Sequence, residues 1–216
     1  DIFYFLEIFQ RKINKKTIET NFSLGNAIFS GIFIKIKNFN KSIEIFTRLF
    51  NKENKIYNVS DGENLFLCAI RKDGQILKNE EEIVSKSGKL IDDIYLLKKK
   101  INNNQLKNFS NFNLKIKKKK FEKLNRIPRI NEAIKNILKN SDIILYGPGT
   151  IHSSLLPTYL TKNLSEFITK SNALKILISN IGKDKDMLFE DTDNIIKKTY
   201  YYLKLKNKKN INQSKL

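Results

Sequence analysis

Several residue types that often carry structural or catalytic roles are rare or absent in this chain. Its 216 residues include no tryptophan, one histidine and a single cysteine, Cys68. A lone thiol cannot close an internal disulfide, so the sequence excludes a disulfide scaffold and suits a reducing cytoplasm. We therefore expect a cytoplasmic protein in which Cys68 is a small buried residue of a strand.

Long hydrophobic runs are missing as well. No apolar stretch approaches the roughly 20 residues that span a bilayer. No basic segment precedes the short apolar run at residues 2–6, so we expect neither a signal peptide nor a membrane partner. Apolar residues still make up 40% of the chain, which is typical of a folded globular protein rather than a disordered one.

Arginine is scarce although the chain is strongly basic. The formal net charge is +19, yet only five residues are arginine, the side chain that most readily forms bidentate hydrogen bonds with bases and phosphates. The lysine excess accompanies many asparagines and isoleucines, which is the bias that AT-rich codons produce. We expect any nucleic-acid affinity to be weak and indifferent to sequence, with no specific nucleic-acid partner.

The distribution of residues along the chain predicts one domain over residues 1–205 and a polar tail over 206–216. Residues 98–123 are rich in lysine and asparagine, and we expect an inserted, irregular segment there. Its densest basic cluster, residues 115–120, is predicted to be a solvated loop. Upstream, Leu65–Ile70 is typical of a strand, and Asp73-Gly74 favours a hairpin turn after it.

The most informative stretch is Asp142–Pro157, Asp-Ile-Ile-Leu-Tyr-Gly-Pro-Gly-Thr-Ile-His-Ser-Ser-Leu-Leu-Pro. Its apolar, β-branched start predicts a buried parallel strand. Gly147-Pro148-Gly149 ends this strand, and Thr150 and Ser153 can cap the helix that follows. A glycine-bounded turn between a strand and a helix gathers backbone N–H groups and hydroxyls where an anion can bind.

A second strand, Lys175–Asn180, follows a helix near Ser165–Ser171. This alternation of helices and strands is the signature of a parallel crossover. The sequence therefore predicts an α/β fold: a three-layer, Rossmann-like, mainly parallel sheet with a small β-hairpin, incomplete at its N-terminus.

Within the turn, Gly149 and Thr150 are the expected backbone donors to a phosphate, because Pro148 has no N–H. Ser153 and Ser154 are expected to hydrogen-bond the same anion. The turn lacks the Gly-Lys-Ser/Thr sequence of a Walker A loop. His152 is either an acid or base near the ligand or an exposed residue of the first helical turn, and we favour the exposed position.

Four blocks of sequence, in order, resemble the CofD-like/YvcK-like superfamily. They are Ser23–Gly31, Val59–Leu67, Ser141–Pro157 and Asn172–Asn180. The third is the most specific, because it is similar to the family's A-D-x-I-x-x-G-P-G-S-x-x-T-S-x-x-P pattern. The family's glycine-rich first strand-loop and its acidic segment do not precede the first block, so the resemblance implies the C-terminal portion of the fold.

The resemblance implies a nucleotide or sugar-nucleotide ligand and adds Gly25, Asn26, Gly147 and Asn180 to the expected contacts. One branch of the superfamily is the 2-phospho-L-lactate transferases, in which an alcohol attacks a phosphoryl centre of a guanylated donor with a divalent ion such as Mg²⁺. The other branch is non-catalytic, uridine-diphosphate-sugar-binding regulators of central carbon metabolism or cell-wall synthesis.

Our first hypothesis is a protein of the transferase branch and our alternative is a protein of the regulator branch, and the sequence leaves open whether the chain is an enzyme. Asp61 resembles the acidic residue of the transferase branch and is a candidate metal ligand; otherwise it is a turn residue. Asn180-Ile-Gly-Lys resembles the regulator branch. An incomplete fold also predicts a homodimer or a complementing N-terminal segment as partner.

Overall fold

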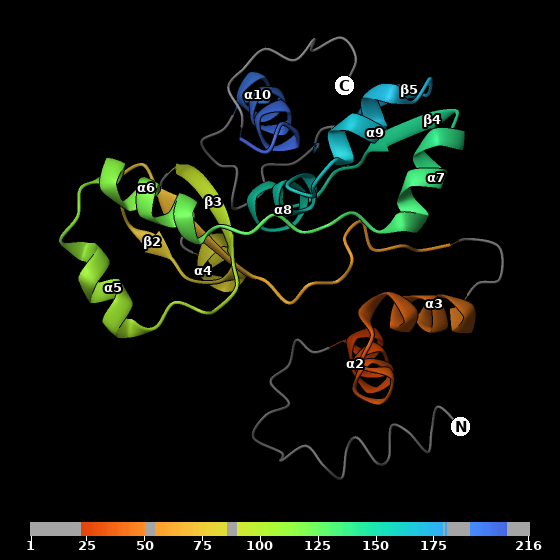
Figure 1. The fold of residues 1–216 in the computed structure, drawn as a ribbon, viewed down its shortest axis with the longest axis horizontal. Coiled ribbons are helices and arrows are strands. Elements are labelled where there is room, and N and C mark those ends of the chain that lie inside the picture. The colour runs from red at the N-terminus through yellow and green to blue at the C-terminus, as the bar shows by residue number, and fades with distance from the viewer. Residues whose placement is uncertain (1–22, 51–54, 86–89, 179, 181–190, 207–216) are drawn as a thin grey trace. The chain divides into compact units, whose positions relative to one another are not determined.

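The structure is a computed structural model that describes residues 23–50, 55–85, 90–178, 180 and 191–206 (Figure 1). The chain divides into two compact units, Asp1–Gly62 and Glu63–Leu216. That both belong to one domain, as predicted for residues 1–205, stays a prediction. The described residues form helices and two small sheets, so the fold is mixed α/β. None of the described helices has the length and apolar character needed to cross a membrane.

The described part of the first unit contains two helices, α2 (Leu24–Ile36) and α3 (Phe39–Phe50). They pack through aromatic edges. The centroid of the Phe29 ring lies 5.3 Å from that of Phe39 and 5.7 Å from that of Phe46, both in T-shaped geometry. Such edge-to-face pairs are preferred over stacked ones because the positive ring edge meets the negative ring face.

The second unit begins with a three-stranded antiparallel sheet. Its strands are β1 (Phe66–Arg71), β2 (Ile76–Leu77) and β3 (Ile91–Leu97), in the order β2-β1-β3. The helix α4 (Glu80–Ser85) connects β2 to β3. The predicted hairpin at Asp73-Gly74 is confirmed: Gly74 has a φ of +83°, a conformation that glycine adopts without steric cost.

Residues 98–123 form two helices, so the prediction of an irregular segment was wrong. α5 spans Asn103–Ser110 and α6 spans Leu114–Leu124, and the basic cluster at 115–120 lies on α6. Each helix begins at an asparagine, Asn102 or Asn113, whose side chain accepts a hydrogen bond from a backbone N–H three residues later. The asparagines that suggested a loop are helix caps.

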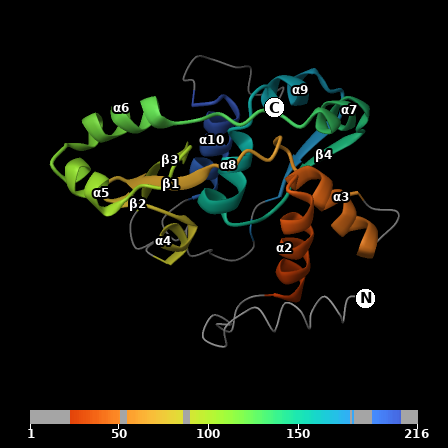
Figure 2. The ribbon, with the colours of Figure 1, turned by 60° about the horizontal axis from the view of Figure 1, so that its bottom comes forward.

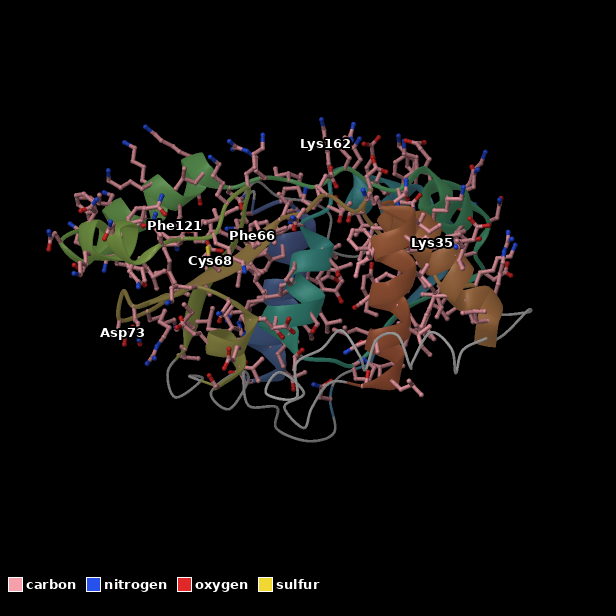
Figure 3. The ribbon with its side chains drawn as sticks, turned by 90° about the horizontal axis from the view of Figure 1, so that it is seen from below. Lys35, Phe66, Cys68, Asp73, Phe121 and Lys162 are labelled. Atoms are coloured by element: carbon pink, nitrogen blue, oxygen red, sulfur yellow. The ribbon has the colours of Figure 1, made fainter. Side chains whose placement is uncertain are left out.

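Phe121 fastens α6 to the antiparallel sheet. It is fully buried, and its ring centroid lies 5.3 Å from that of Tyr95 on β3 and 4.9 Å from that of Phe109 on α5. Phe121 and Cys68 belong to the same buried cluster and lie close together (Figure 3). Burial of these rings therefore holds both lysine-rich helices on the sheet.

Cys68 is 1% exposed in β1, which confirms the sequence prediction, and burial raises the pKa of its thiol to about 12. Because the thiolate is the reactive form, we expect the native protein to resist iodoacetamide at pH 8 and to react once denaturant unfolds it. Mass spectrometry of the alkylated protein measures this. Rapid stoichiometric labelling of the folded protein would contradict it.

The C-terminal half contains a parallel strand pair, β4 (Ile143–Tyr146) and β5 (Leu174–Leu177) (Figure 1). The helices α7 (Glu132–Asn140) and α9 (Leu164–Lys170), which precede the two strands in the chain, lie next to each other (Figure 2). This confirms the predicted crossover, but the prediction that β4 is buried was wrong, since Ile143 and Leu145 are 54% and 57% exposed. The described strands make one parallel pair and two antiparallel pairs in separate sheets, rather than a mainly parallel sheet. The sequence pattern marks strands, but it does not say which edges pair.

A buried carboxylate joins β3 to the last helix, α10 (Thr192–Leu203). The Tyr202 hydroxyl donates to Asp93 Oδ1 at 2.7 Å, and the Tyr95 hydroxyl donates to Asp93 Oδ2 at 3.2 Å. Lys206 Nζ lies 2.9 Å from Asp93 Oδ1 and 3.6 Å from the centroid of the Tyr95 ring. Burial raises the pKa of Tyr202 and lowers the pKa of Lys206.

Lys206 was expected to begin the polar tail, and this was wrong. Leu205 and Lys206 have φ values of 51° and 63°, a left-handed turn that folds the chain back after α10. The Lys206 side chain is only 7% exposed because the turn directs it to Asp93. The predicted tail from residue 207 onwards lies outside the described residues.

Candidate functional site

The site is built where the two parallel strands end. Tyr146 pairs with Leu177, and the Ile178 backbone N–H donates to the Tyr146 carbonyl at 3.0 Å. Carboxyl ends of parallel strands lie at the same edge of a sheet, so the chain segments that leave them emerge together. The glycine turn at residues 147–150 and Asn180 therefore lie side by side.

The Asn180 side chain holds the turn through both groups of its amide. Gly149 N–H donates to Asn180 Oδ1 at 3.0 Å, and Asn180 Nδ2 donates to the Gly149 carbonyl at 3.1 Å. This pair of bonds closes a ring between the turn and the end of β5. The Gly149 N–H, which we expected to contact a ligand, thus donates within the protein.

Three hydroxyl groups cluster just after Gly149, where the turn leads into the next helix. Ser153 Oγ donates to Thr150 Oγ1 at 2.9 Å, and the hydroxyls of Thr150 and Ser154 lie 2.6 Å apart. Thr150 occupies the cap position of the π-helix η1 (Ile151–Leu155), but its side chain makes no capping bond. The expected caps at Thr150 and Ser153 were therefore wrong, because the hydroxyls bond one another instead.

Both glycines of the turn leave room for an added side chain. A Cβ at Gly147 would meet no described atom within 4 Å. A Cβ at Gly149 would touch the Leu155 side chain at 3.5 Å, an ordinary contact distance. The fold around the turn therefore does not itself require these glycines, and a ligand that approaches the backbone closely would explain them.

A small pocket opens beside the turn. Its volume of about 20 Å³ has room for about one water molecule. The walls are mostly apolar: Gly147, Pro148, Ile151, Leu155, Leu156, Tyr159, Leu177, Ile178, Asn180, Ile195 and Thr199. Burial raises the pKa of Tyr159 to about 12, so its phenol is neutral at physiological pH.

α8 (Leu156–Tyr159) and α10 lie next to each other and complete these walls (Figure 2). The structure also contradicts the expectation that His152 is exposed. This residue is 1% exposed, and its Nε2 lies 2.9 Å from Nζ of Lys198, which also donates to the Ile91 carbonyl at 3.1 Å. An ammonium group can only donate, so a protonated Lys198 requires Nε2 of His152 to be the acceptor in this contact.

A pattern in the sequence could have shown that His152 is buried. It precedes Leu155, Leu156 and Tyr159 by three, four and seven residues, so it shares their apolar helical face. The Lys198 partner was not predictable, because it comes from a helix 46 residues further along the chain. His152 is therefore buried next to the site and does not line the pocket beside the turn.

Three predicted residues lie in the first unit. Gly25 and Asn26 are in the first turn of α2, where the Asn26 backbone N–H donates to Ser23 Oγ at 3.2 Å. Asp61 is exposed beside Gly62, which has a φ of +80°. Among the described residues, no three histidine, cysteine, aspartate or glutamate side chains gather as metal ligands. Ligand contacts by Gly25 and Asn26 and metal binding by Asp61 stay predictions.

Fold and site together define a mixed α/β protein with a glycine-bounded turn at the end of a parallel strand pair. The family model described as 2-phospho-L-lactate transferase CofD matches residues 5–200. The chain belongs to this family, as its sequence blocks predicted.

Relatives with curated names include gluconeogenesis factors. A provisionally named gluconeogenesis factor of Lactococcus lactis is 26% identical over 198 residues, which cover 89% of this chain and 52% of the relative. The gluconeogenesis factor of Bacillus subtilis is 23% identical over 175 residues, which cover 81% of this chain and 46% of the relative. The chain thus spans about half the length of the curated relatives that it matches.

Solved structures show the same fold. A crystal structure of a UPF0052-family protein from Bacillus halodurans superposes with a TM-score of 0.64 at 19% identity, covering 93% of this chain and 56% of that one. A second crystal structure of the same Bacillus halodurans protein gives a TM-score of 0.57 at 23% identity, covering 81% of this chain and 47% of that one.

Proposed function

We propose that the turn from Gly147 to Ser154 binds the phosphate groups of a nucleotide-activated ligand. The observation that carries this proposal is the cluster of three hydroxyls, from Thr150, Ser153 and Ser154, at the carboxyl end of two parallel strands. Hydroxyl donors at a strand-to-helix turn are well placed for an anion, and open α/β sheets bind ligands at this edge.

In this proposal Asn180 keeps the turn closed until a ligand arrives. The pocket beside the turn has room for about one water, so a diphosphate needs the turn to open. Displacing Asn180 exposes the Gly149 N–H and carbonyl together. The ligand phosphate then replaces the Asn180 oxygen as the acceptor of the Gly149 N–H, and the three hydroxyls supply further donors.

The first candidate activity is that of a ligand-binding regulator, which holds a uridine diphosphate sugar without consuming it. The relatives named above support this choice, because they are named gluconeogenesis factors and the resemblance places that name in the regulator branch. The second candidate is phospholactate-type transfer from a guanylated donor, and the description of the family model supports it. Both candidates use the same turn to hold phosphate.

We also propose that β4 and β5 belong to a larger, three-layer, Rossmann-like sheet. Ile143, Leu145, Leu174 and Ile176 alternate along the two strands and are 38–60% exposed. Parallel sheets are normally covered on both faces. Since the relatives are about twice as long, further elements of the fold, or a second copy, would cover this apolar face.

The described residues do not form a cluster of ligands for the predicted Mg²⁺. Asp61 is a single exposed carboxylate, and the described residues provide no group of three acidic, histidine or cysteine ligands. No step of the proposed function is therefore routed through a metal. Asp61 stays the predicted metal ligand of the first unit, and at the turn the ligand phosphates themselves are the expected oxygen donors to a divalent ion.

Calorimetric titration tests the binding proposal, and chromatography of the recovered nucleotide separates the two activities. We expect uridine diphosphate glucose to bind and to be recovered intact. The double variant Ser153→Ala/Ser154→Ala should bind at least about tenfold more weakly, since it loses two hydrogen bonds to a charged group. Ser165→Ala/Thr169→Ala, with two hydroxyls removed from α9, is the matched control.

Consumption of a guanylated phospholactate donor in the presence of magnesium and a deazaflavin alcohol would establish transfer instead of sensing. If neither nucleotide binds the folded protein, or if the two double variants weaken binding equally, the turn is not the site.

A further inference from the structure

The basic charge of the protein is concentrated in one short segment. Residues 98–123 contain ten lysines and one acidic residue, Glu122, a net charge of +9 in 26 residues. The remaining 190 residues carry only the other +10. A codon bias that acted evenly along the chain would not produce this difference, so the segment calls for a local explanation.

The structure sorts the lysines of α6 into two groups. Lys117 and Lys118 serve the fold: Lys117 Nζ donates to the Gly74 carbonyl at 2.9 Å, and Lys118 Nζ pairs with Asp92 at 2.9 Å. Four others on the same helix are exposed: Lys115, Lys119, Lys120 and Lys123. Three of these are spaced by four residues, so they form one stripe along the helix, with about 6 Å of rise between neighbours.

On the same pair of helices, residues of α5, of α6 and of the turn between them line an open hollow of about 460 Å³. Three exposed amide side chains line it, from Gln105, Asn108 and Asn111. Two aromatic rings and a lysine complete it: Phe109, Phe112 and Lys120. Lys120 Nζ lies 4.5 Å from the centroid of the Phe112 ring, so a cation already rests over that aromatic face.

We propose that this surface, Gln105–Lys123, binds single-stranded nucleic acid without sequence preference. The lysine stripe provides cations for phosphates, the ring of Phe112 can stack on a base once Lys120 turns from that ring to a phosphate, and the amides can hydrogen-bond base edges. Buried Phe121 holds both helices on the sheet, so the surface is formed before a partner arrives. Amides and a half-buried ring suit bases better than they suit the acyl region of a membrane.

The surface is separate from the glycine turn, so the proposal stands apart from the proposed nucleotide ligand. Lysines carry charge without the planar fork of arginine, which is why the binding is indifferent to sequence. Weak, salt-dependent binding is therefore the expected mode. If three or four phosphates are contacted, the logarithm of the association constant should fall with a slope of about −2 to −3 against the logarithm of salt.

Fluorescence anisotropy with labelled oligo(dT) and a mixed-sequence oligonucleotide tests this on the full chain. The variant Lys115→Glu/Lys119→Glu/Lys123→Glu should bind at least tenfold more weakly at about 50 mM salt, and its salt slope should approach zero. The matched control, Lys139→Glu/Lys162→Glu/Lys197→Glu, changes the net charge equally with exposed lysines of other elements and should stay within about twofold. Phe112→Ala should weaken binding by about fivefold or more, through lost stacking.

Equal losses in both triple variants would overturn the proposal, because they would show a general charge effect. Tighter binding to vesicles that contain phosphatidylserine than to either oligonucleotide would overturn it in favour of a membrane surface. A strong preference for one oligonucleotide sequence would contradict the mode of binding. Circular dichroism of each variant establishes that α5 and α6 remain folded.

Discussion

Replacing Asp93 by alanine should lower the free energy of unfolding by about 3–5 kcal/mol, the usual cost of leaving one partner of a buried ion pair alone. The carboxylate is 1% exposed, accepts hydrogen bonds from the hydroxyls of Tyr202 and Tyr95, and pairs with the ammonium group of Lys206. Its removal strands a lysine whose side chain is 7% exposed. Urea unfolding followed by circular dichroism measures the change.

A surface ion pair provides the comparison. Asp193 pairs with Lys197 at 3.1 Å on the exposed face of α10, and Asp193→Ala should cost no more than about 0.5 kcal/mol, since water already solvates both charges. Adding Lys206→Met to Asp93→Ala should recover part of the loss, because the stranded charge is then gone. If Asp93→Ala costs no more than Asp193→Ala, the buried network does not stabilise the fold as argued.

Replacing Gly147 by valine should abolish ligand binding at the turn while leaving the fold intact. No described atom lies within 4 Å of an added Cβ, so the free energy of unfolding should change by no more than about 0.5 kcal/mol. The valine methyl groups would occupy the space beside the backbone that a phosphate must approach. We expect affinity for the sugar nucleotide to fall by at least about a hundredfold, as measured by calorimetric titration.

Gly147→Ala is the graded control, with a smaller loss of affinity because it adds a single methyl group. Gly149→Val should also block binding, although its side chain meets Leu155 and some destabilisation is expected. Unchanged affinity in folded Gly147→Val protein would show that the ligand binds elsewhere.

Local patterns in the sequence were sufficient where a single segment fixes its own structure. The apolar run before Gly147 predicted β4, and Asp73-Gly74 predicted the hairpin, because strand propensity and turn geometry act between neighbouring residues. Residues 98–123 misled for the opposite reason. Asparagine favours both loops and helix caps, and the packing of Phe121 against the sheet, which favours the helices, is a tertiary contact that the local pattern does not record.

The glycine turn illustrates how sequence and structure divide the site. Sequence placed Gly149, Thr150, Ser153 and Ser154 in one turn, and the structure brings the three hydroxyls together as expected for neighbours. The hydrogen-bond partner of the Gly149 backbone could not be predicted from neighbouring residues. Asn180 reaches it because β4 and β5 pair in parallel, and that pairing joins residues 31 positions apart.

The sequence by itself determined the family, the strand-to-helix turn and the excess of lysine. Only the tertiary structure decided that His152 is buried against Lys198, that Lys206 pairs with Asp93, and which lysines of α6 remain exposed. The physical reason is that burial and charge pairing depend on what packs against a residue. Those neighbours come from elements that are distant in the sequence, which no local pattern records.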